Sequence, residues 1–193
     1  MFKENIKPAI LIFLILTIIT GVVYPLLVTG IAQICFYKQA NGSLIYKNGK
    51  IIGSSLIGQN FDDPKYFFGR PSSTSPAECN ASSSAGSNFG PSNPAFIDAL
   101  KARVEKLRSM DPENKNLVPV DLVTSSASGL DPHISLAAAY YQVPRIARER
   151  RLSQDVVKSI IYKHTAMSFL GFLGERVVNV LELNLELDAY GKA

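Results

Sequence analysis

The sequence contains few cysteine and histidine residues and no tryptophan. Its 193 residues include two cysteines and two histidines. Cys35 lies in an apolar run and Cys79 in a polar segment, so we expect neither a disulfide nor a thiolate metal cluster. With His133 and His164 as the only histidines, we expect no metal site of the zinc type.

Charge is also sparse and mixed in sign. Lysine and arginine number 20 against 16 aspartate and glutamate residues, which gives a net charge of +4. Nucleic-acid binding needs denser basic clusters with interleaved aromatic residues, so we expect no nucleic-acid partner. One local cluster, Arg145, Arg148, Arg150 and Arg151, faces anionic lipid or an acidic partner, or else forms a solvated helix face.

Catalytic motifs are missing from the sequence. It has no phosphate-binding G-x-x-x-x-G-K-[ST] and no G-x-S-x-G elbow. A hydrolase triad could be sought in Ser126 or Ser128 with Asp131 and His133, but these residues are neighbours in the chain. A triad needs side chains that converge from separate elements. We therefore expect no catalytic residues.

A long apolar run begins near the N-terminus. No charged side chain occurs between Lys7 and Lys38, and about 20 apolar residues in a helix cross a bilayer. The run is too long for a cleaved signal peptide, whose apolar region spans about 7–15 residues. We predict a cytoplasmic N-terminus at residues 1–7, a transmembrane helix at 8–37 in contact with lipid, and an extracytoplasmic soluble domain at 38–193.

Gly21, Pro25 and Gly30 interrupt the apolar run. They predict a kinked helix that packs closely on other membrane helices. Alternatively, they reflect the general frequency of glycine and proline in membrane helices. Lysines flank the run on both sides, so the positive-inside rule does not decide its orientation, and a long C-terminal domain can be translocated regardless of them.

Turn and cap residues divide the first half of the soluble region. Asn48-Gly49 between apolar pairs predicts a β-hairpin over residues 43–54. Residues 72–94 are rich in Ser, Ala, Gly, Asn and Pro, which predicts a long structured loop against a partner. Asn93 and Pro94 cap and start a helix that runs to about residue 110.

The second half is expected to be mainly helical. Residues 118–124 read as a short extended segment, and Asp131 is placed to cap a helix that starts at residue 132 and is kinked or ended by Pro144. Another helix is expected over 153–164. Residues 181–187 alternate apolar and polar, which favours a strand, with a helix as the competing interpretation. The predicted class is α+β: a single N-terminal transmembrane helix followed by one mixed α/β extracytoplasmic domain.

Several stretches together resemble the C-subunit family of the bacterial Kdp potassium-transporting P-type ATPase (KdpC). They occur in that family's order over nearly the whole chain: Tyr24-Pro25-Leu26, residues 53–61, 67–72, 86–94, 121–124 and 128–135, Gln142, and residues 178–184.

The resemblance implies an accessory subunit of a high-affinity, ATP-driven potassium uptake complex. Its implied partners are a channel-like potassium-binding subunit, a P-type ATPase subunit and a small accessory subunit, which between them handle K⁺ and ATP. The family role is assembly of the complex and action as a catalytic chaperone that raises the ATP affinity of the ATPase subunit. The chain itself would have no ion path and no hydrolysis site.

The resemblance also links particular residues to nucleotide, and further residues are expected to contact partners. Those linked to nucleotide are Ser84, Gly86, Ser87, Asn88 and Gln142, with Ala85 standing where the family often has glycine. The residues expected at partner interfaces are Gly21, Tyr24, Pro25 and Gly30 in the span and Arg70, Asp131 and His133 in the soluble domain.

The family places its soluble domain outside the cytoplasmic membrane, with a single pass and the N-terminus inside. ATP is bound inside, so any effect on ATP affinity would be a coupling through the complex. The soluble domain is expected to cap the potassium entrance of the channel subunit. The competing hypotheses are a membrane-anchored extracytoplasmic enzyme and a free-standing sensor or adhesion domain.

Overall fold

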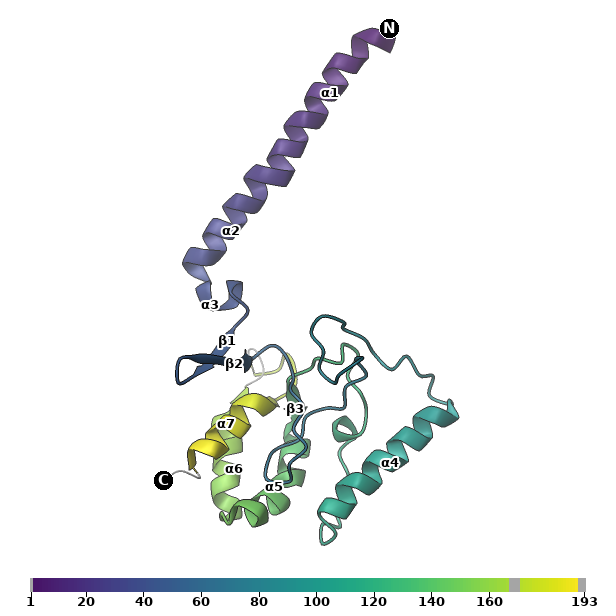
Figure 1. Ribbon diagram of the computed structural model, residues 1–193, viewed down its shortest axis with the longest axis vertical. Coiled ribbons are helices and arrows are strands. Elements are labelled where there is room, and N and C mark those ends of the chain that lie inside the picture. The colour runs from purple at the N-terminus through teal and green to yellow at the C-terminus, as the bar shows by residue number, and fades with distance from the viewer. Residues whose placement is uncertain (1, 167–170, 191–193) are drawn as a thin grey trace. The chain divides into compact units, whose positions relative to one another are not determined.

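The structure is a computed structural model that describes residues 2–166 and 171–190. Its chain divides into two compact units, Met1–Leu44 and Ile45–Ala193. The first contains a long helix, and the second contains a small sheet with helices packed around it (Figure 1). The predicted mixture of helices and strands, preceded by one long apolar helix, is confirmed.

The first unit consists of helical segments in immediate succession. They are α1 (Phe2–Ile18), a π-helical turn η1 (Ile19–Val23), α2 (Tyr24–Cys35) and the short α3 (Tyr37–Ala40). Glu4–Cys35 is long and apolar enough to cross a membrane, and its most apolar window is 0% buried within the structure. Such a helix is stable only where lipid or other apolar helices cover it.

The π-helical turn lies where the sequence predicts a kink. Pro25 has no backbone N–H and cannot donate to the carbonyl of Gly21, four residues earlier. Directly before it, the N–H of Tyr24 donates to the carbonyl of Ile19, five residues earlier. The irregularity therefore follows from the missing proline donor.

The predicted hairpin is confirmed as β1 (Leu44–Lys47) and β2 (Lys50–Ser54). Both turn residues have left-handed backbone angles, with φ of 52° at Asn48 and 76° at Gly49. Asparagine and glycine tolerate these angles better than other residues, which is why this pair closes the turn.

A three-stranded antiparallel sheet lies at the centre of the second unit, in the order β3-β5-β4. β3 (His133–Ser135) pairs with β5 (Val177–Asn179) so that Ile134 lies opposite Val178. β4 (Thr165–Ala166) pairs with the other edge of β5. Ile134 and Val178 are both buried, so this pair anchors the sheet in the core.

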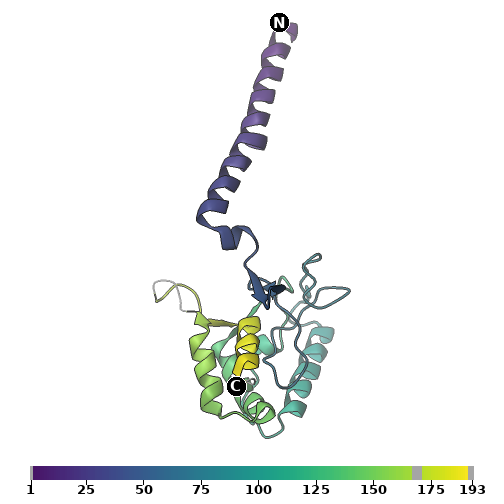
Figure 2. The ribbon, with the colours of Figure 1, turned by 60° about the vertical axis from the view of Figure 1, so that its left-hand side comes forward.

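Three helices cover the sheet: α5 (Leu136–Arg150), α6 (Gln154–Lys163) and α7 (Val180–Tyr190). α6 packs against both α5 and α7 (Figure 2). The largest apolar side chains that they bury are Ile146, Ile160, Ile161, Leu183 and Leu187. The predicted helix after Ser153 is confirmed, since the Ser153 hydroxyl accepts a hydrogen bond from the N–H of Val156.

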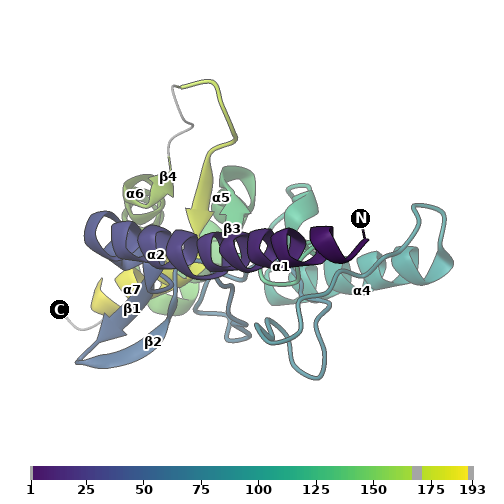
Figure 3. The ribbon, with the colours of Figure 1, turned by 90° about the horizontal axis from the view of Figure 1, so that it is seen from above.

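α4 (Pro94–Met110) lies on the opposite side of the second unit from α6 and α7 (Figure 3). Its predicted start is confirmed, because the Asn93 side chain accepts a hydrogen bond from the N–H of Ala95 at 2.9 Å. Leu107 is its buried residue, and Leu100 and Val104 pack against the core beside it.

Three local predictions were wrong, and a fourth was only partly tested. Residues 118–124 contain a 3₁₀ turn, η2 (Val120–Leu122), rather than an extended segment. The helix expected at residue 132 begins at Leu136, because residues 133–135 pair with β5 and Ser135 takes over the cap. Of the two effects expected of Pro144, the structure excludes an end of the helix, because α5 continues to Arg150, and the kink stays a prediction. Residues 181–187 belong to helix α7.

Candidate functional site

Two polar segments pack together in the second unit and form what we call the loop platform, residues 70–90 with residues 125–133. The N–H of Ser126 donates to the carbonyl of Pro71 at 3.3 Å, and the N–H of Ala85 donates to the carbonyl of Ser128 at 3.1 Å. Side-chain hydroxyls add bonds from Ser72 and Ser84. These two segments, in which only His133 belongs to a strand, are therefore held in one shape by specific hydrogen bonds.

Ser72 and Thr74 organise the first half of the platform. The Ser72 hydroxyl donates to the carbonyl of Gly129 at 2.7 Å and accepts from the N–H of Cys79 at 3.0 Å. The Thr74 hydroxyl accepts from the N–H of Asn80 at 3.0 Å and donates to the carbonyl of Ala77. These side chains satisfy backbone groups that would otherwise lack partners in the loop.

Glycine is required at two points where the segments meet. A Cβ at Gly86 would lie 2.7 Å from the carbonyl oxygen of Ala127. Gly129 has φ of 69°, and a Cβ there would lie 2.6 Å from the Thr74 side chain. Any larger residue would separate the two segments.

The nucleotide-linked residues of the loop occupy its second half. Ser84 donates through its hydroxyl to the carbonyl of Ser128 at 2.9 Å. Gly86 lies at the close approach described above, Ser87 is half-buried, and Asn88 is exposed with φ of 52°. Ser84 and Gly86 therefore have packing roles within the platform.

Gln142 lies in the core, with a side chain that is 1% exposed. Its amide oxygen accepts from the N–H of Phe68 at 2.8 Å and from the Arg145 guanidinium at 2.7 Å. Its amide nitrogen donates to the carbonyls of Phe68 and Ala138. Among the described residues, no hydrogen bond joins Gln142 to residues 84–88, so the structure does not bring these residues together through direct bonds.

The structure does bring together the three expected interface residues of the soluble region. Arg70 Nη1 donates to Asp131 Oδ2 at 3.1 Å, and His133 Nδ1 lies 3.7 Å from Asp131 Oδ1. The N–H of His133 also donates to Asp131 Oδ1 at 3.0 Å. The His133 imidazole, its backbone N–H and the Arg70 guanidinium lower the pKa of Asp131 to about 2, although burial opposes them.

The four expected interface residues of the span lie in the first unit. A Cβ at Gly21 or Gly30 would meet no other atom within 4 Å, and the Tyr24 side chain is exposed. Pro25 lies directly after the π-helical turn. The structure thus leaves this surface open to lipid or to other helices.

The interpretation of the arginine cluster as a lipid-facing or solvated surface was wrong for Arg145. Its side chain is 3% exposed and donates to the carbonyls of Pro64 and Tyr66 and to Gln142. The guanidinium also lies 4.0 Å from the centre of the Phe68 ring. Burial lowers the pKa of Arg145 to about 10.

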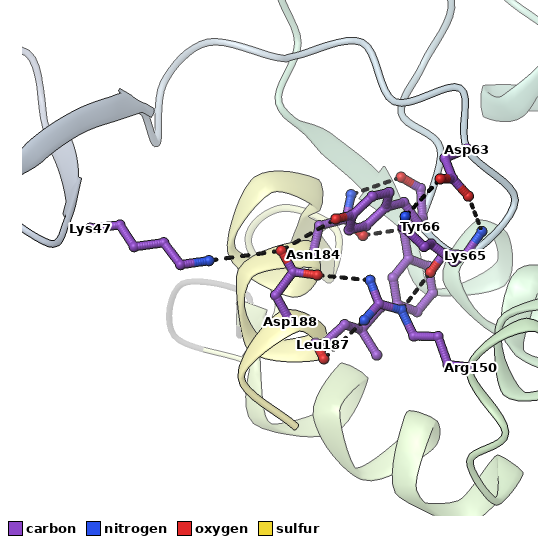
Figure 4. A network of polar contacts seen from close by, with 9 residues as sticks. Lys47, Asp63, Lys65, Tyr66, Arg150, Asn184, Leu187 and Asp188 are labelled. Carbon is purple, nitrogen blue, oxygen red and sulfur yellow. Dashed lines mark hydrogen bonds and ion pairs between the residues drawn. The ribbon is translucent and has the colours of Figure 1, made fainter. Parts of the chain in front are cut away.

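The same segment is held by a second arginine, Arg150 (Figure 4). The Arg150 guanidinium donates to the carbonyls of Lys65 and Leu187 and to the Asp188 carboxylate, at 2.7, 3.1 and 3.0 Å. Arg148 pairs instead with the buried Asp111 at 2.7 Å. α5 therefore uses its arginines to hold neighbouring backbone in place.

The roles of these arginines were not predicted from the sequence, because their partners are mostly backbone carbonyls of a distant segment. The sequence did contain an indication that Gln142 and Arg145 are buried, since they share one helical face with Ala138 and buried apolar residues.

Among the residues that the structure describes, no group of three His, Cys, Asp or Glu side chains is placed to hold a metal ion.

Comparison with known proteins gives consistent matches over nearly the full length. The family model described as KdpC, K⁺-transporting ATPase, c chain, matches residues 6–189. A relative from Dechloromonas aromatica (strain RCB) is 58% identical over 98% of this chain and 100% of its own length. Relatives from Methylococcus capsulatus and Janthinobacterium sp. are 59% and 55% identical, each over 96% of this chain and 98% of their own length. All three bear the name potassium-transporting ATPase KdpC subunit.

Proposed function

The chain belongs to the KdpC family, the c chain of the K⁺-transporting ATPase, and we propose that it is a non-catalytic accessory subunit of an ATP-driven, high-affinity potassium uptake complex. It assembles with a channel-like potassium-binding subunit, a P-type ATPase subunit and a small accessory subunit. These partners carry the ion path, the K⁺ and the ATP chemistry. The chain stabilises their assembly and raises the ATP affinity of the ATPase subunit.

The observation that carries this proposal is the apolar helix Glu4–Cys35, whose most apolar window is 0% buried by the residues that the structure describes. Lipid and the membrane helices of partner subunits supply its cover. Gly21 and Gly30 let another helix approach closely, because each leaves space where a side chain would stand. The helix spans the bacterial cytoplasmic membrane once, with residues 1–7 inside and residues 38–193 outside.

The loop platform supports a docking role for the second unit. Its exposed polar surface is held in one shape by hydrogen bonds, so little conformational entropy would be lost when a partner binds. Through this surface the second unit docks onto the channel subunit and caps its potassium entrance. Any effect on ATP affinity is then transmitted through the partners as a coupling free energy.

Co-purification tests the proposal. The full chain is expressed with the other subunits, of which the ATPase subunit carries an affinity tag. In one variant, leucine replaces Gly21, Tyr24, Pro25 and Gly30; in the matched control, leucine replaces four other apolar residues of the span, Ile10, Phe13, Val22 and Val28.

We expect the control to be recovered with the complex, and the first variant to be recovered several-fold less, with lower K⁺-stimulated ATPase activity. Equal recovery of both variants would contradict a specific helix interface. Recovery of the wild-type chain only as a free monomer in detergent would favour a sensor or adhesion domain instead.

A further inference from the structure

A pocket of about 140 Å³ lies between the loop platform, α4 and η2. Phe68, Leu107 and Leu122 supply apolar lining, and all three belong to the core or pack against it. Arg70 and Arg103 supply guanidinium groups to the same pocket. The lining thus combines an apolar surface with positive charge.

The two guanidinium groups meet at one residue, Ser125. Arg70 Nη2 donates to the carbonyl of Ser125 at 3.3 Å, and Arg103 Nη2 donates to its hydroxyl at 3.2 Å. Two segments far apart in the sequence therefore place their cationic groups close together. Asp131 offsets the charge of Arg70, and a further anion close to Arg103 would reduce the repulsion between the two cations.

The hydrogen-bonding capacity of both arginines is only partly used. Arg103 bonds to neutral groups, the carbonyl of Val123 at 2.8 Å and the hydroxyl of Ser125. No ion pair of Arg103 occurs among the described residues, and burial lowers the pKa of its guanidinium, an effect that the charge of Glu78 opposes. Arg70 pairs with Asp131, yet its Nε is buried without a hydrogen-bond partner in the described part of the chain.

The remaining charges of the pocket are at its exposed rim. Lys106 lies 3.7 Å from Asp62, and both side chains are more than half exposed. Glu78 is also exposed. Neither rim carboxylate forms a hydrogen bond with Arg70 or Arg103 among the described residues.

Size and chemistry restrict the ligand. Pockets for cofactors and drug-sized molecules enclose roughly 300–1,000 Å³, so this one, at about 140 Å³, is too small for a nucleotide. Guanidinium groups bind carboxylates through paired hydrogen bonds, and the apolar lining suits a short hydrocarbon stem. An aspartate or glutamate side chain has both features.

We propose that this pocket receives an acidic side chain of a partner subunit, whose carboxylate binds Arg70 and Arg103. The source of the carboxylate rests on the proposed function, in which the second unit docks onto a larger subunit. Glu78 of this chain would compete with the partner's carboxylate for Arg103, since its charge acts on the Arg103 guanidinium.

Cys79 provides a native reporter because it lines the pocket, and the only other cysteine, Cys35, lies in the apolar helix. In full-length Cys35→Ser protein, the Cys79 thiol is modified in parallel by a negatively charged and a positively charged methanethiosulfonate of similar size. The ratio of the two rates measures preference for an anion. Changes in thiol pKa or access act on both reagents and cancel in the ratio.

The proposal predicts opposite effects for two substitutions. Arg103→Gln should lower the ratio of anionic to cationic rates by about threefold or more, and Glu78→Gln should raise it by a similar factor. An unchanged ratio in Arg103→Gln would overturn the anion-binding pocket. Thermal unfolding of each variant confirms that the fold is retained.

A second measurement tests the source of the carboxylate. Cys79 should react at least about tenfold more slowly in the assembled complex than in the isolated chain, because a protein side chain fills the pocket. Arg103→Gln should restore part of the reactivity in complexes that still form. If the complex forms and Cys79 stays fully reactive, partner occupancy is overturned while the accessory-subunit function stands. Failure of the chain to join any complex would instead overturn that function.

Discussion

Gln142 connects three parts of the second unit through one buried amide. It binds both backbone groups of Phe68, the carbonyl of Ala138 on its own helix, and the guanidinium of Arg145. Arg145 in turn holds the carbonyls of Pro64 and Tyr66. Residues 64–68 lead directly into the loop platform, so this amide helps to set the position of the platform.

We predict that Gln142→Leu lowers the free energy of unfolding by about 2–4 kcal/mol, because it leaves the Phe68 backbone and the Arg145 cation without their buried partner. Urea unfolding of the full chain in detergent, followed by tyrosine fluorescence, measures the loss. Glu149→Gln, an exposed change on the same helix, should stay within about 0.5 kcal/mol of the wild type. A loss below about 1 kcal/mol in Gln142→Leu would contradict the role assigned to this amide.

Asp131 should make stability depend on pH in the acid range. Its folded-state pKa is about 2, against an ordinary value of 3.8. A lowered carboxyl pKa contributes stability that is complete above the unfolded-state value and is lost as the pH falls toward 2. Because this carboxylate is partly exposed, solvent screening reduces the contribution to about 1 kcal/mol.

Unfolding measured between pH 5 and pH 2 tests this expectation. Asp131→Asn should be less stable than the wild type at pH 5, and the difference should shrink toward pH 2. Asp155→Asn, whose side chain is almost fully exposed, should keep the wild-type slope. A parallel offset for Asp131→Asn at every pH would exclude the ion pairs as the cause.

Single residues of the candidate site could be predicted only in part. Arg70, Asp131 and His133 were identified from the sequence, and the structure places them in contact. Arg103 was missed because its position on α4 reads as a solvated helix face, and the segment that it bonds to is about 20 residues away. Side-chain bonds to a distant backbone leave no local pattern in a sequence.

At the scale of elements, Gly129 determines how closely the two segments of the loop platform approach. Its φ is 69°, and the atoms that surround its Cα leave no room for a side chain. Gly90 lies in the same polar region, but a Cβ there would meet nothing within 4 Å. The two glycines therefore form a matched pair for substitution.

We predict that Gly129→Ala destabilises the second unit by about 1–3 kcal/mol and exposes residues 72–90 to protease, because the positive φ and the steric contact both oppose a Cβ. Gly90→Ala should change stability by less than about 0.5 kcal/mol and leave the protease pattern as in the wild type. Limited proteolysis and urea unfolding are the measurements. If both variants resist the protease equally, Gly129 is not required to hold the two segments of the loop platform together.

An element could be predicted from the sequence when the residues that form it lie within a few positions of one another. The β1–β2 hairpin, α4 and α6 were predicted correctly because Asn48-Gly49, Asn93-Pro94 and Ser153 act within a few residues. β3 was missed because three residues become a strand only by pairing with β5, more than 40 positions later. In α7 the buried Asn184 stands in the apolar stripe of Val180, Leu183 and Leu187, which concealed the helical period.

For the whole molecule, the central question is how a subunit whose soluble domain is proposed to lie outside the membrane would raise the ATP affinity of its partner. In the proposed topology the second unit and the bound ATP lie on opposite sides of the membrane. Any influence must then pass through the partner subunits as a difference in how tightly this chain binds their ATP-bound and ATP-free forms. Such couplings are typically about 5–150-fold.

Thermodynamic linkage makes this coupling testable in both directions. If the chain raises the ATP affinity of the remaining complex by some factor, a non-hydrolysable ATP analogue must raise the affinity of the complex for the chain by the same factor. One titration measures the affinity of the remaining complex for labelled chain, with and without the analogue. The other measures its affinity for the analogue, with and without the chain. We expect the two affinities to rise by the same factor, about fivefold or more. Binding of the analogue to the isolated chain would instead require a direct nucleotide site. An analogue that leaves the affinity for the chain unchanged would exclude the chaperone role, because a subunit that binds both forms equally cannot shift the equilibrium between them.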